Sequence, residues 1–309
     1  MPKIAEKNIP FLLLSRLDEI LTGIFMVGLV IMAALRDAPV MERFTSSWLF
    51  LHTMLGAIAV SVAMSSGKRP FVALLKDWLP LLLALAVYES MKHMNASAMT
   101  FWLGIHPKDD LMMAVDVFLF GQTPSVYFKA WGFSSPVAFN IMWFFYNSYY
   151  FIPFVVLGYL QWAKDRENFY IARRGVILAL YGGYCFYVLI PVMGPISAFK
   201  HIVPQNLFDT LPAYEYLMEN FRYNFDCFPS LHVAVPWTLL ILCHKLVPRE
   251  AAILLLVFCC GIALSTMTTG LHYGIDVIAG FAWAATVCFL AKRSKQVEKR
   301  LAEGSKVSG

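Results

Sequence analysis

The chain has 309 residues, of which 59% are hydrophobic and only 15% are charged, with a formal net charge of +5 and a mean hydropathy of +0.62. Soluble domains carry about 25% charged residues, so this composition excludes a soluble globular protein and predicts an all-α bundle of membrane-spanning helices. Apolar segments continue from near residue 18 to near residue 291, which indicates a single membrane domain over residues 1–309.

A membrane-spanning helix needs about 20 mostly apolar residues, and on that criterion the sequence predicts eight spans. They are expected at 18–35, 48–66, 71–91, 137–160, 174–193, 230–247, 250–268 and 271–291. The stretch 92–136 holds only shorter apolar pieces, which indicate interfacial or re-entrant helices. We therefore expect additional N-terminal spans in 1–70, a six-helix core in 71–291 and a basic tail in 292–309.

The 25 Lys and Arg residues are divided unequally between the two sides of the predicted bundle, with 18 on the side of both termini and 7 on the other. Because loops on the cytoplasmic side are enriched in Lys and Arg, both termini are predicted to be cytoplasmic. The outer side then faces the periplasm, the exterior or an organelle lumen. The basic tail is interpreted as an anchor on anionic lipid and not as a nucleic-acid-binding segment.

The stretch NFDCFPSLH at 224–232 opens the sixth expected span from the outer side. Pro229 and Ser230 are residue types that favour a helix start, so His232 is expected in the first turn of its helix. The amide groups and the helix dipole at such a position favour an anion, for example a phosphate group.

The stretch STMTTGLHYGID at 265–276 places His272 and Asp276 at the outer start of the eighth span. Residues i and i+4 share a helix face, so Asp276 can accept the proton of one imidazole nitrogen and leave the other nitrogen available. Spans six and seven form an up-and-down pair, which brings His232 and His272 to the same depth. One histidine can then attack phosphorus or take a proton while the other protonates a leaving oxygen.

Three other interpretations of these residues stay open at this point. The histidines can be satisfied interfacial residues, they can hold zinc or iron together with the carboxylate, or they can belong to a transporter's proton relay. A relay needs ionisable groups at mid-membrane depth, whereas these lie near the outer boundary. Against a metal, no further His, Glu or Cys is clearly positioned nearby and no CxxC or Cys/His spacing is present, so we predict no metal site. Five of the six cysteines fall inside expected spans, and Cys227 has no evident partner.

The two stretches resemble signatures of the type 2 phosphatidic acid phosphatase superfamily. Those signatures usually read PSGH and SRx5HxxxD, and this chain has PSLH followed downstream by S-T-x5-H-x3-D. The fuller pattern, which includes Tyr273, Ala279 and Gly280, is most similar to the inositol phosphorylceramide synthase branch. Weaker similarity to that branch is present in DVFLFG at 116–121, in the tyrosine-rich 146–150 and in PVMGP at 191–195.

The resemblance implies a role for each matching residue. His272 would be a nucleophile that forms a phosphohistidine, Asp276 would orient it, and His232 would protonate the departing alcohol oxygen. Ser230 and the amide groups beside it would hold phosphate oxygens. The phosphatase and transferase branches use no metal, so the resemblance implies no cofactor.

Two phosphate-binding cations of the phosphatase branch are absent from this pattern. Thr266 stands where the arginine of the SR pair is expected, and no K-x6-RP signature precedes PSLH. Ceramide phosphotransferases also lack this arginine, so the departure favours a transferase. The replacement candidates are basic residues expected on the outer side, with Lys92 the first choice at the end of the third span: Lys92, Arg222, Lys200 and Lys129.

The sequence thus predicts a lipid phosphotransferase. It would move a phosphorylated headgroup, such as phosphoinositol, from a phospholipid donor to a lipid alcohol acceptor, such as ceramide or diacylglycerol. The alternative is a lipid phosphate phosphatase that uses water as the acceptor. A non-enzymatic lipid transporter with a decayed site is a further alternative, which the intact His232, His272 and Asp276 disfavour.

Overall fold

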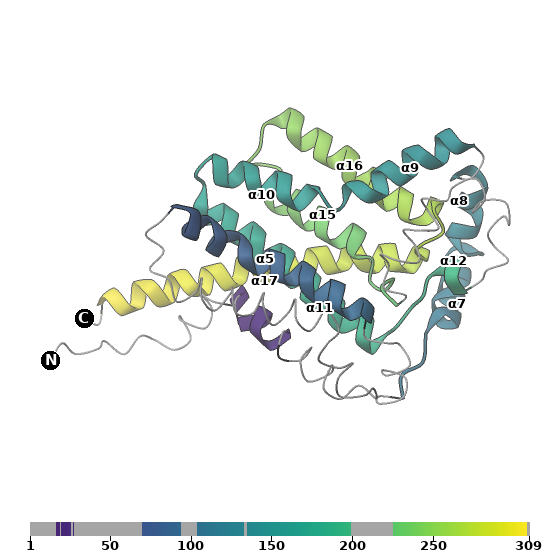
Figure 1. Ribbon diagram of the computed structural model, residues 1–309, viewed down its shortest axis with the longest axis horizontal. Coiled ribbons are helices and arrows are strands. Elements are labelled where there is room, and N and C mark those ends of the chain that lie inside the picture. Colours follow the sequence, from purple (N-terminus) through teal and green to yellow (C-terminus); the bar gives the residue numbers. More distant parts are fainter. Residues whose placement is uncertain are drawn as a thin grey trace.

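The structure, a computed structural model, describes residues 17–18, 20–25, 27, 70–93, 104–132, 135–198 and 225–307. Regular secondary structure in this part of the chain is helical, apart from an isolated β-bridge between Val192 and Asp226. Figure 1 shows the labelled helices, which are α5 (Pro70–His93), α7 (Asp109–Phe120), α8 (Pro124–Gly132), α9 (Pro136–Ser148), α10 (Ile152–Trp162), α11 (Arg166–Leu189), α12 (Pro195–Ala198), α15 (Leu231–Cys243), α16 (Arg249–Thr268) and α17 (Gly274–Val307).

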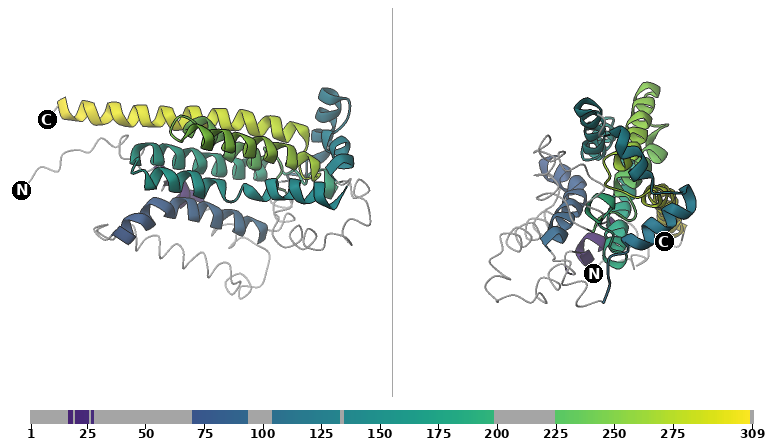
Figure 2. Two further views of the ribbon diagram at one scale, coloured as in Figure 1. Left: turned by 90° about the horizontal axis from the view of Figure 1, so that it is seen from above. Right: turned by 90° about the vertical axis from the view of Figure 1, so that its right-hand side faces the viewer.

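Helix α15 is central to the bundle. It packs against α11, α16 and α17, and ten of its 13 residues are buried, because its sequence LHVAVPWTLLILC is apolar on nearly every face. Figure 2 shows the axes of α11, α15, α16 and α17 roughly aligned with one another, whereas α7 and α8 lie across them at one end of the bundle. That end holds the first turn of α15 and the start of α17.

Two glycines allow the start of α15 to be enclosed closely by its neighbours. A Cβ atom on Gly183 of α11 would lie 2.5 Å from the Leu231 side chain, and one on Gly280 of α17 would lie 2.7 Å from the Ser230 carbonyl oxygen. Real Cβ atoms do not approach other atoms so closely. Because neither glycine has a side chain, α11 and α17 can pack directly against the helix start that carries His232.

The apolar helices identify an integral membrane protein. Within the described residues, α16 and residues Gly274–Glu298 of α17 are long and apolar enough to cross a membrane, and α9 with α10 provides a third candidate if the bent pair is one span. The expected total of eight spans is not confirmed. The expected span at 48–66, and most of the one at 18–35, lie outside the described residues.

The expected span 137–160 consists of two helices, α9 and α10, whose axes differ by 47°. The side chains of Asn147 and Ser148 donate hydrogen bonds to the carbonyl oxygens of Trp143 and Phe145, at 2.7 and 2.6 Å. Such local bonds compete with the helical backbone pattern, and Pro153 in the first turn of α10 has no amide N–H to continue it. Polar residues also lengthen other helices beyond the expected apolar limits, so α11 begins at Arg166 and α17 ends at Val307.

A buried ion cluster lies near the start of α11. The Asp18 carboxylate accepts hydrogen bonds from Arg173, at 2.8 and 3.1 Å, and from Arg174, at 3.1 Å, and all three residues are buried. Arg173 also donates to the Asp77 carbonyl oxygen at 2.7 Å, and Arg174 donates to the Ser294 hydroxyl at 3.0 Å. One carboxylate and two guanidinium groups therefore connect the N-terminal helical piece with α5, α11 and α17.

We expect Asp18→Asn to lower the free energy of unfolding by about 3 kcal/mol, because two buried guanidinium groups lose the charge that they share. The measurement is unfolding of the purified protein in mixed micelles as a denaturing detergent is titrated. Arg166→Gln is the control, since Arg166 pairs with Asp77 at 3.1 Å but its side chain is 61% exposed. An exposed pair contributes less than about 1 kcal/mol, and equal losses in the two variants would contradict the assigned role of the cluster.

Candidate active site

His272 lies in the short connection between α16 and α17. Its amide N–H donates a hydrogen bond to the Thr266 carbonyl oxygen at 3.1 Å, and its carbonyl oxygen accepts one from the hydroxyl of Ser125 in α8. The residue is only 2% exposed. Contacts from two separate helices therefore fix the backbone that presents this imidazole.

Asp276 lies in the first turn of α17, whereas His272 precedes this helix, so the expected shared helix face is wrong although the two side chains do meet. Its Oδ2 is 3.4 Å from Nδ1 of His272, and the same oxygen accepts a hydrogen bond from the Tyr273 amide at 2.9 Å. Asp276 is fully buried. A carboxylate held in this way favours the tautomer with its proton on Nδ1, which leaves the lone pair of the ring on Nε2.

His232 lies in the first turn of α15, beside the bend between α9 and α10. Its ring stacks on that of Tyr146, with centroids 4.1 Å apart and an interplanar angle of 22°, and its centroid is 4.3 Å from that of Tyr149. The ring centroids of His232 and His272 are 5.8 Å apart. This separation allows both imidazoles to contact one phosphoryl group.

Ser230 immediately precedes α15, and its side chain lies beside the His272 ring. Its Oγ is 3.4 Å from Nε2 of His272, and its side chain makes no hydrogen bond that caps α15. Its amide N–H donates to the Asp276 carbonyl oxygen at 3.0 Å. The start of α15 is thus joined directly to the first turn of α17, which brings His232, His272 and Asp276 into one site.

Two buried aspartates of α7 hold the start of α17, and the sequence analysis did not predict this role. The Asp116 carboxylate accepts hydrogen bonds from the amides of Gly274 and Ile275, at 2.9 and 2.8 Å. Burial raises the pKa of the Asp116 carboxyl, and these two hydrogen bonds act in the opposite direction. Asp109 accepts hydrogen bonds from the Tyr273 hydroxyl at 3.0 Å and from two amides just before α12. The sequence did contain a sign of this role, since α7 has aspartates in a helix that is otherwise mostly apolar.

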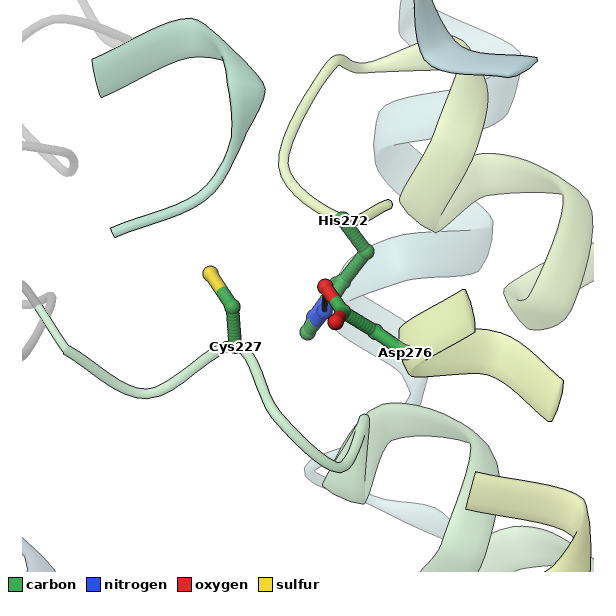
Figure 3. Close-up of side chains that lie close together, drawn as sticks. All are labelled: Cys227, His272 and Asp276. Carbon is green, nitrogen blue, oxygen red and sulfur yellow. Dashed lines mark hydrogen bonds and ion pairs between the residues drawn. The ribbon is translucent and has the colours of Figure 1, made fainter. Parts of the chain in front are cut away.

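Cys227 also reaches the site, and its position there was not predicted. The ligand atoms of Cys227, His272 and Asp276 all lie within 4.8 Å of one another, and all three residues are buried. Figure 3 shows the three side chains near one another, on the segment before α15, the α16–α17 connection and α17. Those of His272 and Asp276 meet, whereas the Cys227 sulfur points away from them in this view. The Cys227 thiol donates a hydrogen bond to the Leu271 carbonyl oxygen at 3.2 Å.

Thr266 supports the site through its backbone. Its carbonyl oxygen accepts the amide N–H groups of Leu271 and His272, each at 3.1 Å. Its hydroxyl donates to the Ala263 carbonyl oxygen at 2.8 Å, and the residue is fully buried. At the position where the resemblance expects arginine, the chain therefore has a neutral side chain that is bonded to its own helix.

The predicted phosphate-binding cations stay predictions. Lys92 lies in the last turn of α5 and Lys129 lies in α8, but their side chains are outside the described part of the structure. Arg222 and Lys200 lie wholly outside it.

A sequence model of the PAP2 superfamily matches residues 110–290, which is more than half of the 309 residues. The chain belongs to the PAP2 superfamily. Members of this superfamily are typically phosphatases or phosphotransferases, so membership indicates an enzyme that acts on lipid phosphates. The match does not distinguish the inositol phosphorylceramide synthase branch. A search of curated proteins and a search of solved structures both find no match.

In this PAP2 superfamily member we expect Asp116→Ala to lower the free energy of unfolding by about 1–2 kcal/mol, because a side chain that caps a helix is lost. Turnover of a lipid phosphate should fall by about tenfold or more, since the helix start that carries Asp276 shifts. Detergent-induced unfolding and initial rates measure the two effects.

Asp110→Ala is the matched control for this variant, because Asp110 is the exposed acidic neighbour of Asp109 in the same helix. We expect it to change neither quantity appreciably. If both variants behave alike, Asp116 does not position α17.

Proposed function

We propose that the protein is a lipid phosphotransferase in which His272 is the nucleophile, Asp276 orients it and His232 exchanges a proton with the substrate oxygen. The proposal is carried by the convergence of two imidazoles from separate elements, with ring centroids 5.8 Å apart. One of the two faces a buried carboxylate at 3.4 Å. A nucleophile, an orienting acid group and a general acid within reach of one another are what such a reaction requires.

In the first half-reaction, Nε2 of His272 attacks the phosphorus atom of a phospholipid, and the phosphorus–oxygen bond to diacylglycerol breaks. His232 in its protonated form gives its proton to the departing oxygen. Asp276 balances the positive charge that develops on the His272 ring. The Ser230 hydroxyl and the start of α15 stabilise the anionic phosphoryl oxygens.

In the second half-reaction, a lipid alcohol takes the place of diacylglycerol. The neutral His232 removes the proton of its hydroxyl group as the oxygen attacks phosphorus, and the phosphorus–nitrogen bond to His272 breaks. Both histidines then return to their starting protonation states. Two half-reactions through one covalent intermediate predict ping-pong kinetics.

Thr266 supports a phosphodiester as the donor. A phosphate monoester carries close to two negative charges near neutral pH, whereas a phosphodiester carries one. Where an arginine is expected, the buried Thr266 hydroxyl bonds to Ala263 at 2.8 Å, so this position adds no positive charge. We therefore favour a headgroup donor such as phosphatidylinositol, with ceramide or diacylglycerol as the acceptor.

Labelled substrate distinguishes transfer from hydrolysis. The purified protein in micelles is incubated with headgroup-labelled phosphatidylinositol, with and without ceramide or a diacylglycerol whose acyl chains differ in length from those of the donor. We expect the label to appear in the acceptor lipid only when that lipid is present. Release of labelled phosphoinositol or phosphate in either condition would instead support the alternative, a phosphatase that discharges the same intermediate with water.

We expect His272→Ala to reduce turnover about a thousandfold or more, because the nucleophile is lost, and His232→Ala to reduce it about a hundredfold or more, because the proton donor is lost. Initial rates with the labelled donor measure both losses. His244→Ala is the control, since this exposed histidine contacts only the Leu240 carbonyl oxygen of its own helix, at 3.1 Å, in the interactions described. Wild-type turnover by His272→Ala with every donor would refute the catalytic assignment.

A further inference from the structure

We infer that Cys227, His272 and Asp276 form an inhibitory site for a thiophilic divalent cation such as Zn²⁺. The binding of the ion follows from the geometry of the three residues alone. Its effect on activity rests on the proposed function, because the same ion would occupy the nucleophile. Of the three ligands, Cys227 is the one to which the proposed transfer reaction assigns no role.

The separation of the three ligand atoms is close to that of a zinc site. Zinc bonds of about 2.0–2.3 Å in a tetrahedral arrangement hold ligand atoms about 3.3–3.8 Å apart. Nδ1 of His272 and Oδ2 of Asp276 are already 3.4 Å apart. All three ligand atoms lie within 4.8 Å of one another, so the Cys227 sulfur, which now donates to the Leu271 carbonyl oxygen at 3.2 Å, turns toward His272 and Asp276 to complete the set.

The chemistry of the ligands selects the ion. A thiolate, an imidazole and a carboxylate are the three ligand types that zinc takes, and three protein ligands leave a fourth position for water. Magnesium and calcium prefer oxygen ligands throughout, which only Asp276 supplies here. Two anionic ligands also balance a divalent charge, and this matters because all three residues are buried.

Binding of the ion is accompanied by proton release. Cys227 loses its thiol proton to solvent and gives up the hydrogen bond to Leu271, which is 3.2 Å long. If the ion takes Nδ1 of His272, the remaining ring proton lies on Nε2, and the lone pair that attacks phosphorus is absent. If the ion takes Nε2, that lone pair is used directly. In either arrangement His272 cannot form the phosphorus–nitrogen bond, so the ion inhibits the enzyme.

Cobalt provides a readout that does not depend on activity. Co²⁺ is added to the purified full-length protein in micelles, and thiolate-to-cobalt charge-transfer absorption is followed in the near ultraviolet. We expect one equivalent of Co²⁺ to produce the band and Zn²⁺ to remove it. Cys227→Ser, which keeps a hydrogen-bond donor for Leu271 but removes the sulfur ligand, should lose the band, and so should His272→Ala.

Cys260→Ser is the matched control, because Cys260 is an exposed cysteine on α16 and is therefore a candidate for adventitious binding. It should keep the band. Loss of the band in this control, its persistence in Cys227→Ser, or its absence from the wild type would each overturn the inference.

Inhibition is tested in parallel with the labelled donor. Zn²⁺ should inhibit the wild type, a chelator should restore the rate, and Cys227→Ser should raise the half-inhibitory concentration at least about tenfold. Each variant is compared with its own rate in the presence of chelator. An unchanged half-inhibitory concentration overturns the inhibitory role and leaves the metal-free transfer rate, and so the proposed function, untouched. A cobalt band in a protein without transfer activity supports the site and counts against the proposed function alone.

Discussion

The candidate site depends on the direct contact between two helix starts. The Ser230 amide donates to the Asp276 carbonyl oxygen at 3.0 Å, and Gly280 leaves room for the Ser230 carbonyl oxygen on the facing side. A residue larger than glycine at position 280 would force the two segments apart. Because His232 follows Ser230 and His272 precedes Asp276, the distance between the imidazoles is set by this backbone contact and not by the flexible side chains themselves.

Buried carboxylates hold helices in place at both ends of the described bundle. Asp116 receives two amides from the start of α17, and Asp18 receives two guanidinium groups from α11. In each case a buried charge is balanced by several directed hydrogen bonds, which is the condition under which burial is tolerated in an apolar medium. Both also join segments that are distant in the sequence, so the helices that carry the site are held at each end.

The parts of the site that the sequence predicts are those encoded locally. The i, i+4 spacing of His272 and Asp276, and the helix-start residues before His232, need no knowledge of the fold. The contributions of Asp116 and Cys227 depend on contacts with residues far along the chain, so no spacing reveals them. The length of the apolar stretch likewise predicts α16 correctly, but it does not predict the bend between α9 and α10. Asn147, Ser148 and Pro153 change individual backbone hydrogen bonds, and an average of hydropathy over a segment contains no information about them.

The aromatic rings around His232 make its imidazole protons observable by magnetic resonance. Its ring lies 4.1 Å from Tyr146 and 4.3 Å from Tyr149, measured between centroids. Ring currents in two flanking phenol groups displace the magnetic resonance frequencies of an imidazole proton. A group that binds against His232 and alters its stacking on these rings changes that displacement. His232 therefore offers a built-in spectroscopic probe of binding at the candidate site, which does not depend on any chemical reaction.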